Sequence, residues 1–179
     1  MVRQATEQDI EAIADMGMEF MSGTKYASVL PMYRDDARAA ILQLHLVGRV
    51  WVAEIEGRIR GFLAASIIPC WFNPRSRIAL EHVWWMDEDV RGRVEGMRLL
   101  LEFERWAKEQ GAQVACLSDI VLEAGSPAGS ILQRLGYEVS ERTFLKVLPC
   151  STAISDESTT SPHAASDTSQ SLPSSQESP

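Results

Sequence analysis

The sequence contains few cysteines, and their spacing excludes two kinds of structural crosslink. Its three cysteines are Cys70, Cys116 and Cys150, which stand far apart and form no paired motif. Zinc sites and disulfide frameworks are recognised by cysteines at recurring short spacings. We therefore expect a protein of a reducing compartment, with no disulfide framework and no metal.

The sequence also lacks a long apolar run and an excess of basic residues. No stretch approaches the length of about 20 apolar residues that spans a bilayer, and the N-terminus, MVRQATEQDI, has no apolar signal core. There are 17 Lys and Arg against 25 Asp and Glu, for a formal net charge of -8. Proteins that bind nucleic acid or anionic lipid normally have a basic face. We expect a soluble, cytoplasmic protein that binds neither, and a cationic substrate such as an amine is compatible with this charge.

The C-terminal segment, residues 149–179, has a composition of its own. It contains no Lys or Arg and consists largely of Ser, Thr, Pro and Ala. Such a segment buries too little apolar surface to offset the entropy that it loses on ordering. We therefore predict a disordered, acidic tail at residues 149–179. Residues 1–148 are predicted to form one folded domain, because the chain is 45% apolar and long enough for a sizeable core.

Hydrophobic periodicity in the N-terminal part predicts a short strand followed by two helices. Residues 2–5 have the character of a strand, and Thr6 with Asp9 forms the capping pattern of a helix start. Apolar residues then recur at intervals of three and four over residues 10–21 and again over residues 34–47. Both segments are therefore predicted to be amphipathic helices.

The pattern then changes to the period of a β-sheet. Residues 49–55 and 58–68 are β-rich runs separated by Glu56-Gly57, which is a hairpin signal. Residues 69–77 contain two prolines and an Asn-Pro step, which predict a loop. Residues 78–86 are predicted to form a third strand of the same sheet.

The remaining elements complete a mixed sheet. A long helix is predicted over residues 94–110, a buried strand over 113–120, a helix from Ser126-Pro127 to Gly136, and a last strand or strand pair over 137–148. The resulting order is β-α-α-β-β-β-α-β-α-β. An antiparallel meander that leads into a strand-helix-strand crossover indicates an α/β (α+β) mixed sheet with helices on it, and not a doubly wound parallel fold.

A turn rich in arginine and glycine joins the third of these strands to the long helix. The stretch DVRGRVEGM places Arg91 and Arg93 beside Gly92 and Gly96. The first turn of a helix has backbone N–H groups without partners, and the helix dipole adds partial positive charge. Glycine lets a phosphate approach these groups closely. The turn therefore predicts a diphosphate site, although an ordinary turn with surface arginines gives the same short pattern.

Residues 91–96 resemble the acyl-CoA-binding motif of the GNAT superfamily of N-acetyltransferases, which is Arg/Gln-x-x-Gly-x-Gly/Ala after a central strand. Arg91 and Gly96 match its first and last positions, and Val94 replaces the middle glycine. The segment ILQRLGYEV is similar to the superfamily's segment near its C-terminal end, and the order of elements over residues 2–148 is also that of the superfamily. The stretch ALEHVWWMDEDVRG resembles acetyltransferases encoded in phage genomes, which act in the cytoplasm of the host.

This resemblance implies an acyl-CoA N-acyltransferase fold and an N-acetyltransferase activity, with acetyl-CoA as acyl donor and an amine-bearing acceptor. A homodimer is among the expected states, because dimers are frequent in the superfamily. The backbone of Trp84, Trp85 and Met86 would pair with the pantetheine arm. The diphosphate would bind at the following residues: Arg91, Gly92, Arg93, Val94, Glu95, Gly96 and Met97.

Glu81 is the candidate general base, because a substrate amine must be neutral to attack a thioester. Strict alternation along the strand predicts two faces: Glu81, Val83 and Trp85 on one, and His82, Trp84 and Met86 on the other. Apolar neighbours would raise the pKa of Glu81 toward useful base strength. The alternative is a surface acid or an ion pair with Arg77. His82 is the second candidate base, since the pKa of histidine lies near neutrality.

Aromatic residues in the predicted loop are candidates for an acceptor site. Trp71 and Phe72 would line it, and Arg75 and Arg77 would bind an acidic group of the acceptor. The alternative is that the loop folds its aromatic side chains onto the body of the protein.

Three positions depart from the superfamily, and they leave a second function open. Besides Val94, the tyrosine that protonates the leaving thiolate in many members falls on Leu132, and an asparagine often found before that helix falls on Gly125. Cys116 is expected to be a buried, small hydrophobic residue. The alternative function is therefore a catalytically impaired protein that serves as a CoA-binding or protein-interaction module.

Overall fold

The structure of the protein is a computed structural model that describes residues 1–120 and 128–148. The chain divides into a compact unit, Met1–Thr143, and a second unit that begins at Phe144. The described residues of the second unit form no helix or strand. The predicted tail and the predicted helix start at Ser126-Pro127 lie outside the described residues. None of the described helices combines the length and the hydropathy needed to cross a membrane.

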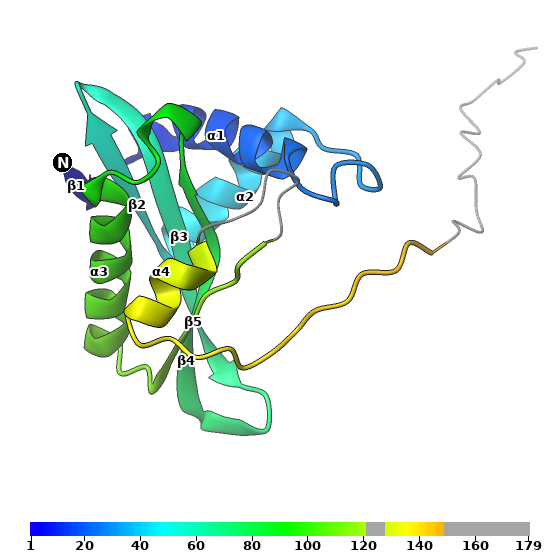
Figure 1. The fold of residues 1–179 in the computed structure, drawn as a ribbon, viewed down its shortest axis with the longest axis vertical. Coiled ribbons are helices and arrows are strands. Elements are labelled where there is room, and N and C mark those ends of the chain that lie inside the picture. Colours follow the sequence, from blue (N-terminus) through cyan, green and yellow to red (C-terminus); the bar gives the residue numbers. More distant parts are fainter. Residues whose placement is uncertain (121–127, 149–179) are drawn as a thin grey trace, which may run out of the picture. The chain divides into compact units, whose positions relative to one another are not determined.

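A five-stranded sheet forms the centre of the first unit (Figure 1). Neighbouring strands are antiparallel except for the last pair, which is parallel. This mixed sheet confirms the predicted fold class. The strands, in their spatial order, are β1 (Val2–Gln4), β2 (Arg49–Ile55), β3 (Arg58–Cys70), β4 (Asn73–Met86) and β5 (Val114–Cys116).

Helices cover both faces of this sheet. On one face, α1 (Ile10–Ser22) and α2 (Arg34–Val47) pack over a core that includes Phe62 and Ala64 of β3. On the other face, α3 (Val94–Glu109) and α4 (Ala128–Arg134) pack over the alternate residues of the same strand. The period of two along a strand thus supplies one apolar row to each layer.

The predictions for α1, α2 and α3 are confirmed, with ends within one residue of those expected. Backbone conformation explains where strands turn and helices end. Glu56 and Gly57 have φ of 54° and 74°, which is the left-handed pair that a two-residue hairpin turn requires. Gly111 has φ of 72° and follows the end of α3, where a left-handed residue commonly terminates a helix.

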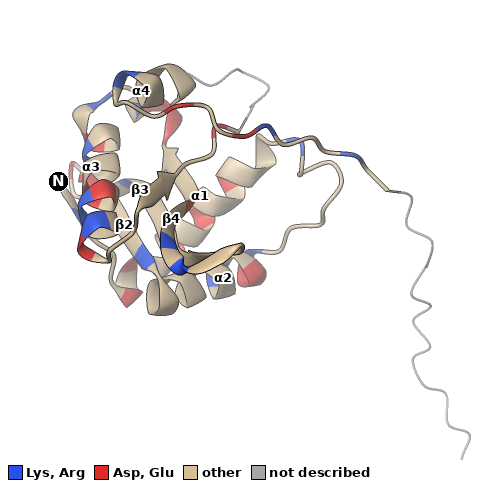
Figure 2. Cartoon of the chain, turned by 90° about the horizontal axis from the view of Figure 1, so that it is seen from below, with Lys and Arg blue, Asp and Glu red and all other residues tan. Residues whose placement is uncertain are grey.

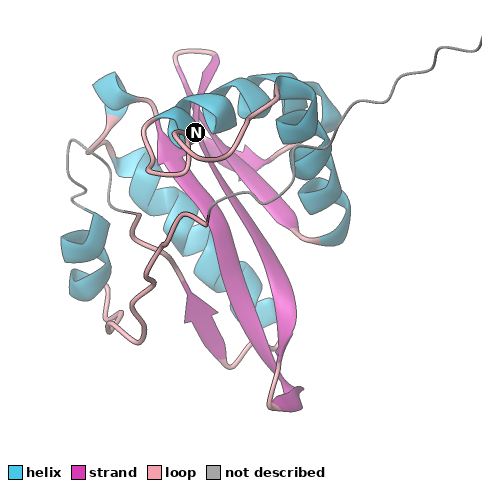
Figure 3. Ribbon diagram, turned by 90° about the vertical axis from the view of Figure 1, so that its right-hand side faces the viewer, coloured by secondary structure: helices cyan, strands magenta, loops and turns pink. Residues whose placement is uncertain are grey.

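The predicted loop at residues 69–77 is wrong, because these residues form a second hairpin. β3 continues to Cys70 and β4 begins at Asn73, so that only Trp71 and Phe72 turn between the strands. Figure 3 shows this hairpin extending past the other strands. The two prolines are tolerated because neither β2 nor β5 reaches the tip, and a proline on an unflanked edge need not donate a ladder hydrogen bond.

Two predictions near the C-terminal end of the described chain also need correction. The predicted buried strand at 113–120 is reduced to β5, whose residues are exposed or half-buried. The predicted last strand at 137–148 is absent from this part of the chain, where the structure describes no strand after β5. The limited burial of β5 has a physical reason. A strand is fully buried only when a neighbour covers its outer edge, and β5 is an edge strand.

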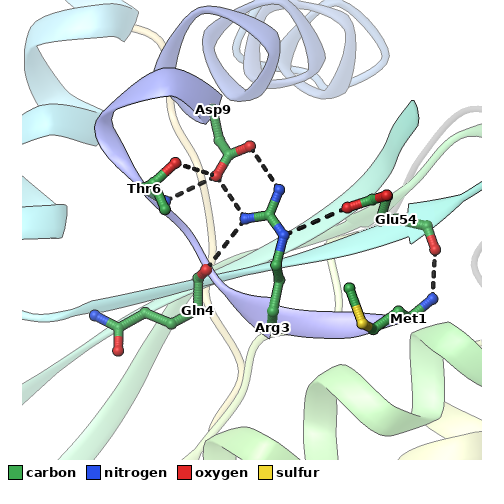
Figure 4. A network of polar contacts seen from close by, with 6 residues as sticks. All are labelled: Met1, Arg3, Gln4, Thr6, Asp9 and Glu54. Atoms are coloured by element: carbon green, nitrogen blue, oxygen red, sulfur yellow. Dashed lines mark hydrogen bonds and ion pairs between the residues drawn. The ribbon is translucent and has the colours of Figure 1, made fainter. Parts of the chain in front are cut away.

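An ion-pair network joins β1 to the start of α1 (Figure 4). Arg3 donates hydrogen bonds of 2.7 and 2.9 Å to Asp9. Asp9 also accepts hydrogen bonds from the backbone N–H and the hydroxyl of Thr6, and these bonds confirm the predicted cap. Thr6 precedes a short 3-10 helix, η1 (Glu7–Asp9). Glu54 of β2 accepts a further bond from Arg3. The hydrogen bond from Arg3 is the main reason why the pKa of buried Asp9 falls from 3.8 to about 2.

Replacing Asp9 by asparagine should destabilise the fold in a pH-dependent way. A carboxylate with a depressed folded pKa stabilises the fold above its unfolded pKa, and this stability is lost as the pH falls through the folded pKa. We expect Asp9→Asn to lower the free energy of unfolding by about 2 kcal/mol at pH 7. Urea unfolding should show this difference vanishing as the pH falls from 3.8 toward 2. Asp35→Asn, an exposed acid at the start of α2, should have little effect at either pH.

Candidate active site

The sheet opens between β4 and β5 at Glu81. β5 pairs with β4 only from Ile78↔Val114 to Leu80↔Cys116, whereas β4 continues to Met86. Beyond Leu80, no described strand pairs with this edge of β4. The backbone N–H and C=O groups of such an edge are available to an extended ligand.

A β-bulge at His82 decides which layer each residue of β4 faces. Ala65 pairs with Glu81 and Ala64 pairs with Val83, so that His82 has no partner on β3. Ala65 belongs to the core beneath α3, and Ala64 belongs to the core beneath α1 and α2. Glu81 therefore faces the α3 layer and Val83 faces the other. The prediction that they share one face is wrong, because strict alternation does not hold across a bulge.

The environment of Glu81 favours proton exchange near neutral pH. The residue is 6% exposed, and its Oε2 accepts a 3.1 Å hydrogen bond from the backbone N–H of Ser118, just beyond β5. Burial raises the pKa of the carboxyl group from 4.5 to about 7, and the Ser118 bond opposes this rise. Neither alternative expected for Glu81 holds. It does not lie on the surface, and the Arg77 side chain donates instead to the carbonyl of Gln110.

His82 lies in a different environment. It is exposed, and its Nε2 is 2.8 Å from the hydroxyl of Ser66. Although the residue as a whole is exposed, partial desolvation of the ring lowers its pKa, which favours the neutral form. Its role as the second candidate base stays a prediction.

The end of β4 is anchored to both helical layers. Trp84 and Met86 pack in the α3 layer, and Trp85 meets Phe20 of α1 edge-to-face with ring centroids 5.7 Å apart. Arg91 folds back over this end, because its Nε donates to the carbonyl of Met86 at 3.1 Å and its guanidinium lies 4.3 Å from the Trp85 ring centroid. The first arginine of the motif thus braces the turn against the strand.

The glycines of the motif have distinct roles, and Val94 causes no backbone strain. Gly92 has φ of 85°, which only glycine adopts readily. Val94 has no positive φ, and its side chain is 54% exposed at the first position of α3. A Cβ on Gly96 would lie 3.4 Å from Cγ of Met86, which is ordinary van der Waals contact, so this position of α3 packs directly against β4.

Charge in the turn is distributed so that one arginine remains open to a ligand. Arg60 of β3 forms ion pairs with Asp87, just before the short helix η2 (Glu88–Val90), and with Asp89 within it, and it thereby offsets two acids close to the motif. Arg93 is half exposed, and its nearest acid is Glu56, at 3.9 Å. The N–H groups of the first turn of α3, together with Arg93, therefore fit an anionic group.

The structure does not bring the predicted acceptor residues to Glu81. Trp71 and Phe72 lie at the hairpin tip, 88% and 73% exposed, with ring centroids 5.1 Å apart. They do not fold onto the body of the protein. The strand from Asn73 to Glu81 spans about 26 Å at about 3.3 Å per residue. A role of Trp71 and Phe72 in acceptor binding, with Arg75, stays a prediction.

Three described residues bear on how a leaving thiolate would be protonated. Leu132 is buried in the α3 core. Tyr137 donates to Glu104 at 3.0 Å, and burial raises its pKa. Cys116 is half-buried, where full burial was expected, and burial raises its pKa so that it remains a thiol. Gly125 lies outside the described residues.

Comparisons with known proteins agree with this architecture. A family model described as Acetyltransferase (GNAT) family matches residues 15–137. A comparison with curated protein sequences gives no significant match. Solved structures superpose on most of the chain at low sequence identity, and this likeness shows the fold.

Three of these solved structures are informative. A protein from Clostridium acetobutylicum described as a predicted acetyltransferase, solved with acetyl-CoA, is 16% identical with a TM-score of 0.62 and covers 82% of this chain and 94% of its own. A ribosomal-protein-alanine N-acetyltransferase from Brucella melitensis is 12% identical with a TM-score of 0.64 and covers 82% and 98%. An aminoglycoside N-acetyltransferase in complex with CoA is 19% identical with a TM-score of 0.65 and covers 84% and 95%.

The raised pKa of Glu81 predicts a distinctive dependence of stability on pH. An acid whose folded pKa exceeds its unfolded pKa binds its proton more tightly in the folded state, so stability falls as the pH rises from 4.5 to about 7. Glu81→Gln removes this penalty. We expect the stability of the variant relative to wild type to rise by about 3 kcal/mol over this window.

Chemical unfolding at a series of pH values measures this difference. Glu138→Gln, which replaces an exposed acid, should show no such trend. A difference between Glu81→Gln and wild type that is constant with pH would rule out a buried carboxyl group that titrates in this window.

Proposed function

Because the chain belongs to the acetyltransferase (GNAT) family, we propose that it is an acetyl-CoA-dependent N-acetyltransferase in which an amine attacks the acetyl group directly. The observation that carries this proposal is Glu81, a buried carboxyl group with a pKa of about 7 at the point where β4 leaves β5. When bound, acetyl-CoA supplies a thioester whose carbonyl carbon accepts the amine and whose thiol leaves.

The residues at the opening fit this donor. We assign the pantetheine arm to the free edge of β4 at Trp84–Met86. The diphosphate is assigned to the backbone of Arg91–Met97, with the charge of Arg93. The open edge, the left-handed turn at Gly92 and the unstrained Val94 support this assignment. Solved structures of the same fold that contain acetyl-CoA or CoA also support it.

Glu81 then acts as the general base. An amine is mostly protonated at neutral pH and has no lone pair to attack with until it loses that proton. The Glu81 carboxylate accepts the proton, directly or through a water, while the Ser118 N–H holds Oε2 in place. The bulge leaves the backbone of His82 outside the β3 ladder, and an N–H at this point is our candidate donor to the developing oxyanion.

The acceptor is proposed only as an amine. The solved structures named above include an enzyme for aminoglycosides and one for a ribosomal protein, and so the fold serves both small and large amines. Specificity lies in loops and side chains that differ between such proteins. The homodimer, the cytoplasmic location and the relation to phage enzymes stay predictions.

The alternative is a catalytically impaired module that binds CoA or another protein. Leu132, in the place of the superfamily's tyrosine, is buried in the core, and the Tyr137 hydroxyl is engaged by Glu104. Neither offers a free hydroxyl to a leaving thiolate. In the enzyme, the thiolate would then take its proton from water, which is compatible with turnover because thiols have moderate pKa values.

Glu81→Gln should separate catalysis from binding. We expect kcat/KM to fall by about 10²- to 10³-fold at neutral pH, as is typical of a lost general base, with little change in the Kd for acetyl-CoA. The wild-type rate should rise with pH through about 7. The pH–rate profile of the variant should lack this rise. The assay measures release of the CoA thiol with three amine acceptors in turn: an aminoglycoside, a polyamine and a peptide with a free N-terminus.

His82→Gln is the matched comparison for this experiment, and its rate should still rise with pH through about 7. Equal rates in wild type and Glu81→Gln would remove Glu81 from the mechanism. If the wild-type protein binds acetyl-CoA but acetylates none of the amines, the binding-module alternative replaces the enzyme.

The diphosphate assignment predicts a selective effect of Arg93. Arg93→Gln should weaken binding of CoA by about tenfold, because a charge-assisted contact with phosphate is lost. Binding of pantetheine, which has no diphosphate, should not change. Isothermal titration with both ligands measures this, and Arg58→Gln, at the exposed start of β3, is the control. An equal loss for CoA and pantetheine would contradict the assignment.

A further inference from the structure

A groove lies at the opposite edge of the sheet from the opening between β4 and β5. It has a volume of about 240 Å³ and runs between the strands β1 and β2 and the C-terminal half of α3. Its floor is formed by Trp51 and Trp106, which are both buried and meet edge-to-face with ring centroids 5.5 Å apart. The other residues that line it are polar or charged: Gln4, Arg49, Glu102, Arg105 and Glu109.

Arg49 forms a positive wall that lacks an anion. Its Nη1 donates to the side-chain oxygen of Gln4 at 2.6 Å, while its Nε is buried without a hydrogen-bond partner. No carboxylate of the described residues forms an ion pair with Arg49. The positive charge of Arg49 is therefore not offset by a described carboxylate, and a guanidinium group matches the two oxygens of a carboxylate.

The facing wall, on α3, has an excess of negative charge. Arg105 forms ion pairs with both Glu102 and Glu109, so that one cation serves two carboxylates. Figure 2 shows acidic and basic residues along α3. The wall therefore has a net negative charge opposite the unpaired charge of Arg49. A simple anion would leave the acidic wall unsatisfied, and a simple cation would leave Arg49 without a partner.

We propose that this groove binds a small zwitterion, a molecule with one carboxylate and one ammonium group, such as a free amino acid. The carboxylate pairs with the guanidinium group of Arg49. The ammonium group lies against Glu102 and Glu109, and the carbon chain between the two charges covers the indoles of the floor. This site is separate from the proposed catalytic site, and its existence does not depend on acetyl transfer.

The first experiment varies the distance between the two charges. Isothermal titration calorimetry measures the affinity of the full chain, without CoA, for four ligands that differ only in chain length: glycine, β-alanine, 4-aminobutanoate and 5-aminopentanoate. Propanoate and propylamine, each with a single charged group, are the controls. We expect one member of the series to bind at least tenfold more tightly than either control. If no member binds more tightly than propanoate, the proposal is wrong.

Two variants then test the assigned walls with the tightest ligand of the series. Arg49→Gln should weaken binding at least tenfold, whereas Arg58→Gln, a matched change outside the groove, should leave it unchanged. Glu109→Gln, on the exposed face of α3, should weaken binding of the zwitterion but not of propanoate. Thermal unfolding checks that each variant is folded. Unchanged binding in both groove variants would overturn the proposal, even if the wild-type protein binds the ligand.

Discussion

The early end of the pairing between β4 and β5 is the constraint on which the candidate site depends. Because β5 stops at Cys116 and β4 continues to Met86, the sheet opens next to Glu81. A longer β5 would continue the ladder along β4 and would cover its free edge. In this structure the same N–H binds the carboxylate. One side chain is therefore buried enough to titrate near neutrality and still lies at an opening.

The bulge at His82 connects this opening to the turn before α3. It places Glu81 in one layer and lets the last residues of β4 engage both layers, with Trp85 held against α1. Arg91 stacks on Trp85 and binds the carbonyl of Met86. The candidate base Glu81 and the turn that precedes the helix are thus fixed to a single strand. Preorganisation of this kind suits a reaction between two bound groups, because little ordering is left to be done when they bind.

Much of the fold can be predicted from local signals, and the site can be predicted from them only in part. Glu56-Gly57 and Gly111 have left-handed conformations that the sequence indicates directly. The bulge has no such signal, since one extra residue on a strand leaves the apolar pattern readable while it moves all later side chains to the opposite face. The prolines of the hairpin tip are misleading because their effect depends on whether a third strand lies alongside.

Two further contacts at the site could not have been inferred from the sequence. The hydrogen bond to Glu81 comes from the backbone of Ser118, and any residue there except proline has that N–H. The ion pair between Arg60 and Asp87 joins β3 to the residue just after β4, and it becomes visible only when the register of the two strands is known. Pattern and motif identify the segments that form the site, whereas the register determines which side chains meet within it.

The arginines of this protein differ in how many of their donors are already engaged, and this difference separates structural from binding roles. Arg3 directs Nε, Nη1 and Nη2 to carboxylates, so that its charge is used entirely within the fold. Arg49, on the neighbouring strand, binds Gln4 but forms no ion pair with a described carboxylate, and Arg93 is half exposed with a loose ion pair to Glu56 at 3.9 Å. A guanidinium that is held in place but incompletely paired still has binding energy for an anion. Arg49 and Arg93 therefore lie where a ligand is proposed, in the groove and in the turn before α3, whereas Arg3 serves the fold alone.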